Sequence, residues 1–510
     1  MLFADVVAAS EAVAATRSRL AKVDALAAAI RRTDGPDEAR TVVAMLGGQP
    51  RQGRIGAGWR TLADLRGTPA SEPALTVAEV DKTLDAVAGA KGAGSTARRA
   101  ELLSAVLSRA TAAEQDFLMR LLLGELRQGA LEGVMVDAVA KATDVEAETV
   151  RRAFMLSGSL PDTATAALAG GSAALADFRL EVGRPVRPML ASPAESLDDA
   201  LTELGQLGSV CVEHKLDGAR IQVHRDGADV HVFTRTLREI TAQVPELVEL
   251  VLGLPCRSIV LDGETLALND DGRPRPFQET MSRFGATSAR ELLLRPYFFD
   301  CLHLDGIDLL DMSLADRNEA LRGVAGPFMI PGGLRPDPDR AAEILAESLA
   351  AGHEGVMVKS LAAPYAAGRR GRGWQKVKPV HTLDLVVLAA EWGHGRRSGY
   401  LSNLRLGARD PDGGPPIMVG KTFKGLTDKL LAWQTAEFPQ HEVRSDRWVV
   451  HLRPEIVVEI ELDGVQVSSR YPGGVALRFA RVLRYRPDKE AADADTIDAV
   501  RALFPGAGRP

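Results

Sequence analysis

The chain has 510 residues, of which 45% are hydrophobic and 25% are charged, and this composition excludes a disordered or fibrous protein. A single hydrophobic core rarely serves a chain of that length, so we expect about three domains. The formal net charge of −6 argues against a protein whose whole surface receives a polyanion.

The N-terminus does not resemble a targeting segment. Asp5 and Glu11 lie within an Ala- and Val-rich helical pattern, where a signal peptide would have a basic start and an uninterrupted apolar run. No stretch is long and apolar enough to span a bilayer. The three cysteines are widely spaced, which is unlike a disulfide framework or a structural zinc site. We therefore expect a cytoplasmic protein without membrane attachment.

Residues 1 to about 175 carry apolar residues at the three- and four-residue spacing of helices. The clearest helical runs are residues 11–32, 77–90, 96–111 and 113–127. Glycine-rich interruptions at 47–50 and 92–95 separate them, and the segment 158–183 closes this unit. We predict an all-α domain over residues 1–178.

From Val210 onward the pattern changes to short β-rich runs with helical stretches such as 341–351 between them. The β-rich runs are residues 210–215, 219–225, 230–234, 259–268, 297–304, 356–359 and 375–378. This mixture predicts an α+β domain with antiparallel sheets over residues 179–382.

Strands dominate again after Leu383, with one expected helix at 427–438. The expected strands are residues 385–389, 404–408, 417–423 and 456–462. A small β-barrel over residues 383–510 is the simplest way to close such strands.

A basic cluster lies across the second boundary. Residues 369–405 contain eight basic side chains against two acids, Asp384 and Glu391. The basic residues are Arg369, Arg370, Arg372, Lys376, Lys378, Arg396, Arg397 and Arg405. Such a cluster could bind phosphates or could be a solvated basic face, and charge alone leaves both readings open.

Lys215 ends an apolar strand and is followed by the turn-forming sequence Leu216-Asp217-Gly218. A strand-end lysine can simply extend its amine into solvent. A lysine that attacks phosphorus must lose its proton, and burial together with nearby cations would lower its pKa enough. Arg220, Lys376, Lys378 or a bound metal ion could supply that positive charge, and a phosphoramidate on Lys215 would be the intermediate.

Two pairs of charged residues have the spacing that places side chains on one face of a strand. Asp262 and Glu264 form one pair, and Lys376 and Lys378 form the other. Glu264 and Glu354 offer the hard oxygen ligands that Mg²⁺ takes together with phosphate oxygens. Carboxylates on unrelated surface strands are the alternative.

The segment 213–220 resembles the nucleotide-binding motif of the covalent nucleotidyltransferases, which include ATP-dependent DNA ligases, RNA ligases and mRNA capping enzymes. Further segments are similar to the other motifs of this superfamily, in the same order: 261–264, 297–300, 354–359, 374–378 and 478–484. The resemblance implies that Lys215 carries AMP. It also assigns Phe299 to adenine stacking, although a lone strand aromatic is ordinarily a core residue.

The resemblance implies roles for further residues of this sequence. Glu213 would recognise the adenine edge, Arg220 the ribose or phosphate, and Lys376 and Lys378 the triphosphate. Arg235 resembles another nucleotide-binding arginine of the superfamily, and a solvent-facing arginine is the alternative. The resemblance further implies that Glu264 and Glu354 bind the metal ion. It implies that Arg478 and Arg481 orient the pyrophosphate.

Three segments outside these motifs are similar to parts of DNA ligases. Residues 122–129 resemble their helical DNA-binding domain, 183–191 the start of their catalytic core, and 382–387 the start of their OB-fold. The chain is thus identified as similar to the ATP-dependent DNA ligases, nearest to the actinobacterial ligase B type. This implies an adenylation domain between a helical domain and an OB-fold, and a monomer that uses ATP and Mg²⁺, or Mn²⁺ in its place.

The implied reaction seals nicks in duplex DNA through lysyl-AMP and DNA-adenylate, in replication, repair or recombination. An RNA ligase or GTP-dependent capping enzyme is one alternative, and a non-catalytic nucleic-acid clamp with an inactive pocket is another. Leu216 and Gln375 depart from the usual residues of the motifs. The segment 132–137 nearly repeats the fourth motif but lacks its final lysine, so we assign it to helix packing.

Overall fold

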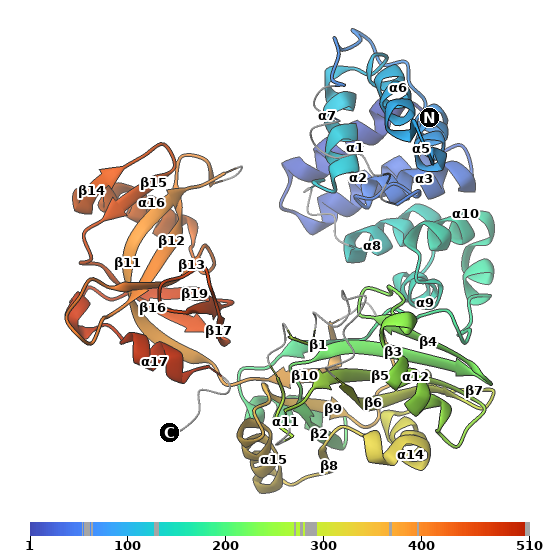
Figure 1. Cartoon of the computed structure of the whole chain (residues 1–510). Coiled ribbons are helices and arrows are strands. Elements are labelled where there is room, and N and C mark those ends of the chain that lie inside the picture. Colours follow the sequence, from blue (N-terminus) through green and yellow to red (C-terminus); the bar gives the residue numbers. More distant parts are fainter. Residues whose placement is uncertain are drawn as a thin grey trace.

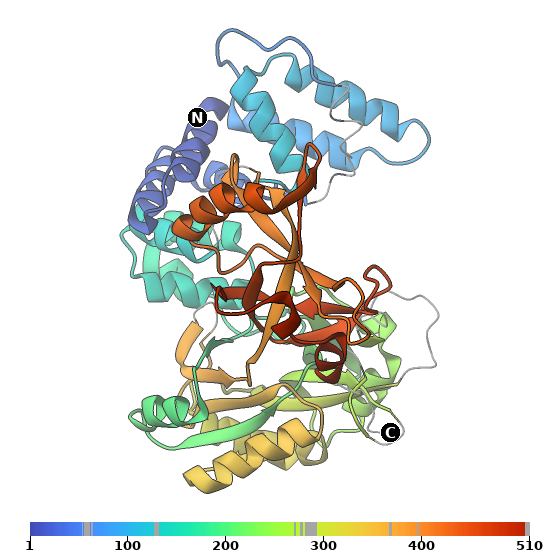
Figure 2. The same ribbon diagram turned by 90° about the vertical axis from the view of Figure 1, so that its left-hand side faces the viewer.

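The computed structural model describes residues 1–53, 55, 62, 65–126, 132–269, 272–275, 279–280, 293–366, 370–394 and 397–504, with the side chains of 370–372 excepted. A helical region, a central region of two sheets and a strand-rich C-terminal region follow one another along the chain (Figure 1). In the view turned by 90°, the C-terminal region lies in front of the other two regions (Figure 2). In the part of the chain described, no helix has the length and apolarity needed to cross a membrane.

The N-terminal region is built from helices around one apolar core, in which the Phe3 and Phe117 rings meet edge to face. The helices are α1 (Phe3–Ala15), α2 (Arg19–Arg31), α3 (Pro36–Leu46), α5 (Val77–Gly89), α6 (Ser95–Leu107), α7 (Ala112–Leu123), α8 (Glu132–Thr143), α9 (Ala147–Ser157) and α10 (Leu160–Ala176). The segment 132–137 is helical as predicted, since it begins α8. The all-α prediction for this region is confirmed.

Some of the predicted helix bounds are wrong. The run 11–32 is divided between two helices. Helix α1 ends at Ala15, and the Ser18 hydroxyl caps α2 by accepting a hydrogen bond from the Ala21 N–H. The α7 helix ends at Gly124, whose φ of 70° is the left-handed conformation that commonly terminates helices. It therefore stops before the predicted end at residue 127, which lies outside the described residues.

The central region has two five-stranded sheets, ordered β1-β10-β9-β2-β8 and β4-β3-β5-β6-β7. The strands are β1 (Leu190–Pro193), β2 (Val210–Lys215), β3 (Ala219–Asp226), β4 (Asp229–Thr234), β5 (Ser258–Ala267), β6 (Leu294–Leu304), β7 (Ile307–Asp308), β8 (Gly332–Leu334), β9 (Gly355–Ser360) and β10 (Arg370–Val377). The helices are α11 (Leu197–Gly205), α12 (Pro245–Leu252), α14 (Leu314–Ala325) and α15 (Pro338–Ala350). These elements confirm the α+β prediction.

One strand pair departs from the expected antiparallel arrangement. β1 runs parallel to β10, and the other pairs within these two sheets are antiparallel. No hairpin joins these two strands, which are far apart in the chain, so no tight turn imposes an antiparallel direction. A cluster of buried side chains that includes Val260, Phe299 and Trp374 joins the two sheets.

The C-terminal region has a seven-stranded sheet around the long strand β11 (His381–Trp392), which pairs with β12, β15 and β16. The other strands are β12 (Leu401–Ala408), β13 (Ile417–Thr422), β14 (Glu442–Ser445), β15 (Val449–Leu452), β16 (Val457–Leu462), β17 (Gly464–Val467), β18 (Val475–Arg478) and β19 (Arg481–Tyr485). The helices are α16 (Asp428–Glu437) and α17 (Ile497–Ala502). The four expected strands and the expected helix are all present, although β11 is longer than predicted.

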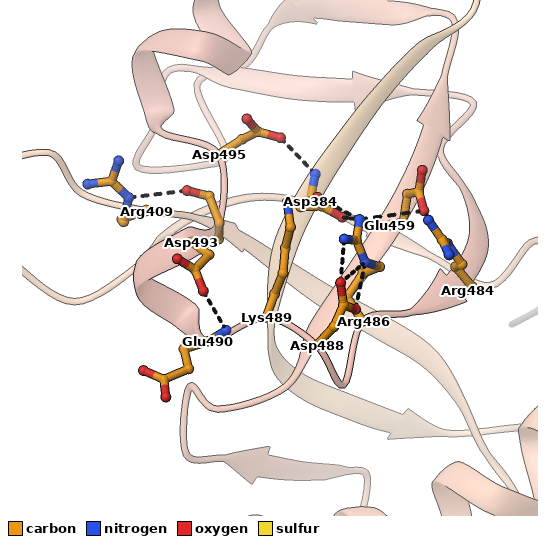
Figure 3. A network of polar contacts seen from close by, with 11 residues as sticks. Asp384, Arg409, Glu459, Arg484, Arg486, Asp488, Lys489, Glu490, Asp493 and Asp495 are labelled. Atoms are coloured by element: carbon orange, nitrogen blue, oxygen red, sulfur yellow. Dashed lines mark hydrogen bonds and ion pairs between the residues drawn. The ribbon is translucent and has the colours of Figure 1, made fainter.

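A polar network fastens residues 486–495 to the first residues of β11 (Figure 3). The Asp384 carboxylate accepts hydrogen bonds from Arg486 at 3.2 Å and from Lys489 at 2.6 Å. Its backbone N–H donates to the Asp495 carboxylate at 2.7 Å, and the Asp495 N–H donates back to the Asp384 carbonyl at 2.8 Å. The C-terminal segment is therefore held as part of this domain from the point where β11 begins.

Candidate active site

Three neighbouring strands bring two lysines to one carboxylate. Lys215 ends β2, Glu354 directly precedes β9, and Lys378 directly follows β10. The Glu354 N–H donates to the Lys215 carbonyl at 2.9 Å, which fixes the two main chains. The Glu354 carboxylate forms ion pairs with Lys215 and, at 2.7 Å, with Lys378. The strand ends thus concentrate positive charge around a single acid.

Gly355 allows these three strands to approach one another. It is the antiparallel partner of Lys215, and its φ of +140° is a conformation that side chains rarely permit. A Cβ atom at this position would lie 2.2 Å from the Val377 carbonyl oxygen. The distance between Lys215 and Lys378 is therefore set by a backbone contact that only glycine can make.

Burial and charge perturb the titratable groups here. Burial tends to raise the pKa of Glu354, but Lys215 and Lys378 outweigh it and hold that pKa below its usual value. Burial lowers the pKa of Lys376, and the charges of Lys378 and Lys215 lower it further. Burial raises the pKa of Glu264 to about 7 against the opposing charges of Arg220 and Lys215. Such opposed shifts in one place are typical of functional sites.

Arg220 is held rigidly on the facing sheet. Its guanidinium donates two hydrogen bonds to Asp262, at 3.0 and 2.6 Å, and a third to the Met189 carbonyl at 2.6 Å. Tyr365 donates to the same Asp262 carboxylate at 2.7 Å. Glu264 is the cross-strand partner of Arg220. These contacts present a fixed cation and a carboxylate beside Lys215.

Two aromatic rings lie buried between the two sheets of the central region. Phe299 and Trp374 meet edge to face with centroids 5.9 Å apart. The Lys359 ammonium lies 4.5 Å from the Phe299 centroid and 4.3 Å from that of Trp374, and it forms a 2.5 Å ion pair with buried Glu213. Burial raises the pKa of Glu213, and Lys359 opposes that effect. The two buried rings therefore lie beside a buried charged pair.

The C-terminal domain contributes to the site. Arg478, at the end of β18, pairs with Asp217 at 2.7 Å and lies 3.9 Å from Glu354. Asp463, in the turn between β16 and β17, lies 3.3 Å from the Lys378 ammonium. Three ion pairs therefore join this domain to the strand ends around Lys215, two through the cation Arg478 and one through the anion Asp463.

Not all of the residues predicted from sequence meet at Lys215. Arg235 is exposed in the turn after β4, and Arg481 is exposed at the start of β19. The basic cluster is divided, because Arg397 donates to the Phe423 carbonyl and Arg405 pairs with Glu391 within the C-terminal domain. Arg369 and Arg396 lie outside the described residues, as do the side chains of Arg370 and Arg372.

Sequence reasoning missed four residues of this site: Asp217, Lys359, Tyr365 and Asp463. Asp217 and Lys359 lie inside the motifs named above and could have been selected there as charged residues near Lys215 and Phe299. Tyr365 and Asp463 reach the site across long sequence separations, from Asp262 and Lys378 respectively. No local pattern marks them. Gln375, an unusual residue for its motif, donates to Glu203 at 2.7 Å.

Three family models match the chain along its length: "DNA ligase N terminus" over residues 61–140, "ATP dependent DNA ligase domain" over 188–378, and "ATP dependent DNA ligase C terminal region" over 397–489. A protein named "Probable DNA ligase" from Rhodococcus jostii (strain RHA1) is 72% identical over 506 residues, covering 99% of this chain and all of the relative. Another protein of that name, from Saccharopolyspora erythraea, is 70% identical, covering 99% of this chain and 98% of the relative. The solved structure "Pmar-Lig_PreS3" is similar in fold, with a TM-score of 0.61, 16% identity, and coverage of 94% of this chain and 99% of that one.

Proposed function

The chain belongs to the ATP-dependent DNA ligase family and is a DNA ligase that uses ATP, and from this premise we propose that it seals nicks in duplex DNA through AMP bound covalently to Lys215. The observation that carries the proposal is the position of Lys215 among Glu354, Lys378 and Arg478. Three phosphoryl transfers follow from it. Lys215 attacks the α-phosphate of ATP and releases pyrophosphate, AMP passes to the 5′-phosphate at the nick, and the 3′-hydroxyl displaces AMP.

The side chains around Lys215 suit these transfers because phosphoryl transfer depends mainly on positioning and charge neutralisation. Lys376 and Lys378 would neutralise the phosphates, with Arg220 held nearby by Asp262. Lys215 must leave its ion pair with Glu354 and lose a proton before its amine can attack. Triphosphate oxygens that bind Lys378 would weaken the ion pairs of Glu354 with Lys215 and Lys378.

The adenine would lie against the ring of Phe299. Glu213 and Lys359 provide a buried acceptor and donor at that ring, and buried polar groups of this kind select strongly for a base that satisfies them. Arg235 and Arg481 belong to the proposal as nucleotide- and pyrophosphate-binding residues from the resemblance alone. Both are exposed.

The residues present fit a magnesium ion. Glu264 and Glu354 supply two carboxylates, each of which interacts electrostatically with Lys215. Mg²⁺ usually takes one or two carboxylates together with phosphate oxygens and water. In the described part of the chain, no group of three or more His, Cys, Asp or Glu side chains forms a metal site. When bound, Mg²⁺ would neutralise charge on the transferring phosphate, and Mn²⁺ could replace it.

We further propose that residues 1–178 bind DNA, residues 179–382 form the adenylation domain, and residues 383–510 form an OB-fold. The matches to N-terminal, central and C-terminal DNA ligase models support this order. In this proposal the protein is a monomer whose three domains surround nicked duplex DNA. The assignment to the actinobacterial ligase B type stays a prediction.

The test measures transfer of label from ATP carrying ³²P in its α-phosphate to the full-length chain, followed by sealing of a nicked duplex. We expect wild type to be labelled and to seal DNA, and Lys215→Ala to do neither. Lys141→Ala, which removes an exposed lysine paired with Asp24, is the matched control and should behave as wild type. Labelling of Lys215→Ala would refute the nucleophile.

Two further arms separate the alternatives. Label taken from GTP in place of ATP would indicate a capping-type enzyme, and sealing of nicked RNA in place of nicked DNA would indicate an RNA ligase. Protein that takes no label but still binds nicked duplex would be a non-catalytic clamp.

A further inference from the structure

Lys378 lies between two carboxylates that belong to different domains. Glu354 approaches it at 2.7 Å from the central region, and Asp463 approaches it at 3.3 Å from the C-terminal region. Asp463 is tied to Arg478, because its backbone N–H donates to the Arg478 carbonyl at 3.1 Å. The β17–β18 hairpin and the residue before it therefore hold Asp463 next to Lys378 and Arg478 next to Asp217.

Arg478 and Asp463 should respond differently to a bound nucleotide. Arg478 remains complementary to Asp217 and would also attract phosphate. Asp463 forms its ion pair with the ammonium of Lys378, and it also interacts electrostatically with Lys376 and Arg478. Once a phosphate of ATP takes the Lys378 ammonium, as the proposed function requires, Asp463 loses its ion-pair partner and faces a group of its own sign. Like charges at this separation repel one another.

We propose that Asp463 is a positioning residue that makes closure of the C-terminal domain depend on the occupancy of Lys378. Without phosphate, Asp463 attracts the C-terminal domain to the site. With phosphate on Lys378, the same carboxylate opposes closure and favours departure of the domain. Asp463 thus competes with ATP for Lys378 before adenylation and promotes opening after it.

The exposure of the pair sets the size of the effect. The side chains of Lys378 and Asp463 are 22% and 35% exposed, so solvent screens the interaction. Ion pairs of this exposure change an equilibrium by about two- to fivefold. Added salt weakens them further, because the Debye length falls to about 3 Å at 1 M ionic strength. A contribution from packing would not depend on salt in this way.

The first experiment measures lysyl-AMP formation by the full-length chain over a range of ATP concentrations. For Asp463→Asn we expect the KM for ATP to fall about two- to fivefold, with little change in the maximal rate and with a smaller shift at high salt. Asp463→Glu should restore wild-type behaviour. Asp412→Asn, the same charge change at an exposed turn of the same domain, is the matched control.

An unchanged or raised KM in Asp463→Asn, with wild type labelled normally, would overturn this inference and leave the proposed function standing. Absence of label in wild type would instead overturn the proposed function, on which the inference rests. The two failures are therefore distinguishable.

A second experiment reads the domain arrangement directly. Small-angle X-ray scattering should give a larger radius of gyration for adenylated wild type than for the nucleotide-free protein. The increase should be smaller in Asp463→Asn and unchanged in Asp412→Asn. Equal increases in wild type and Asp463→Asn would refute the role in opening.

Discussion

Gly355→Ala should separate the strands that carry the two lysines. The added Cβ would lie 2.2 Å from the Val377 carbonyl oxygen, where side chains essentially never come closer than 3.0 Å, so the backbones must move apart by about 0.8 Å. Overpacking of this kind costs about 1–3 kcal/mol, and the φ of +140° adds about 1–3 kcal/mol of backbone strain. Because a misplacement near 1 Å can lower a rate about 100-fold, we expect a comparable loss of Lys215 labelling.

Labelling from α-³²P ATP and thermal unfolding measure the two effects separately. Gly352→Ala is the matched control, since Gly352 also has a positive φ, of +84°, but its Cβ would meet nothing closer than Pro274 at 3.6 Å. It should lose stability through strain alone and should retain most of its labelling. Wild-type labelling by Gly355→Ala, or equal losses in both variants, would refute the steric reasoning.

Three other outcomes follow from contacts of the site and its support. Arg478→Ala removes a charge-assisted hydrogen bond to Asp217, so lysyl-AMP formation should slow about 10- to 100-fold, whereas nick sealing by pre-adenylated protein should change much less; equal losses in both steps would contradict this. Lys359→Met leaves the Glu213 carboxylate buried without its counterion, which should lower the free energy of unfolding in urea by about 3–5 kcal/mol; the double variant with Glu213→Gln should recover most of that loss. Burial, together with His231 and His303, lowers the pKa of His224 from 6.5 to about 3. The contribution of His224 to the free energy of unfolding is therefore complete above pH 6.5 and declines by about 1.4 kcal/mol per pH unit as the pH falls toward 3. The free energy of unfolding of His224→Asn should depend less steeply on pH.

The His224 prediction has a clear structural basis. Its Nδ1 accepts a hydrogen bond from the Gly183 N–H at 3.0 Å, and its Nε2 lies 2.9 Å from the Gln222 side-chain oxygen. The neutral ring satisfies both contacts, but a protonated ring would direct two N–H groups against each other at Gly183. Acid should therefore loosen the segment that leads into β1.

Elements whose pattern is local were predictable from the sequence. The helix expected at 77–90 is α5, Val77–Gly89, and the strand expected at 210–215 is β2. Helical spacing and apolar strand runs depend on neighbouring residues, which is why they were visible. The break at Thr16–Ser18 was not predicted, because apolar residues at helical spacing lie on both sides of these three polar residues, and the cap of α2 depends on the Ser18 hydroxyl. The parallel pairing of β1 with β10 depends on tertiary contacts that no local pattern carries.

The same division holds at the site. Lys215, Glu354 and Lys378 belong to contiguous motifs, and the structure brings them together. Asp463 and Tyr365 act across 85 and 103 residues respectively, so only the folded chain brings them to Lys378 and Asp262. A resemblance of motifs can name the groups expected to meet the nucleotide. It cannot name the groups from elsewhere that hold them.

The ion pair between Lys215 and Glu354 also bears on chemical durability. An ammonium held by a carboxylate has no free lone pair, and the Lys215 side chain is only 19% exposed. Metabolic electrophiles that acylate or glycate lysines need an unprotonated, accessible amine. The low exposure of Lys215 and its ion pair with Glu354 should therefore make its acylation slower than that of the exposed lysines of the chain.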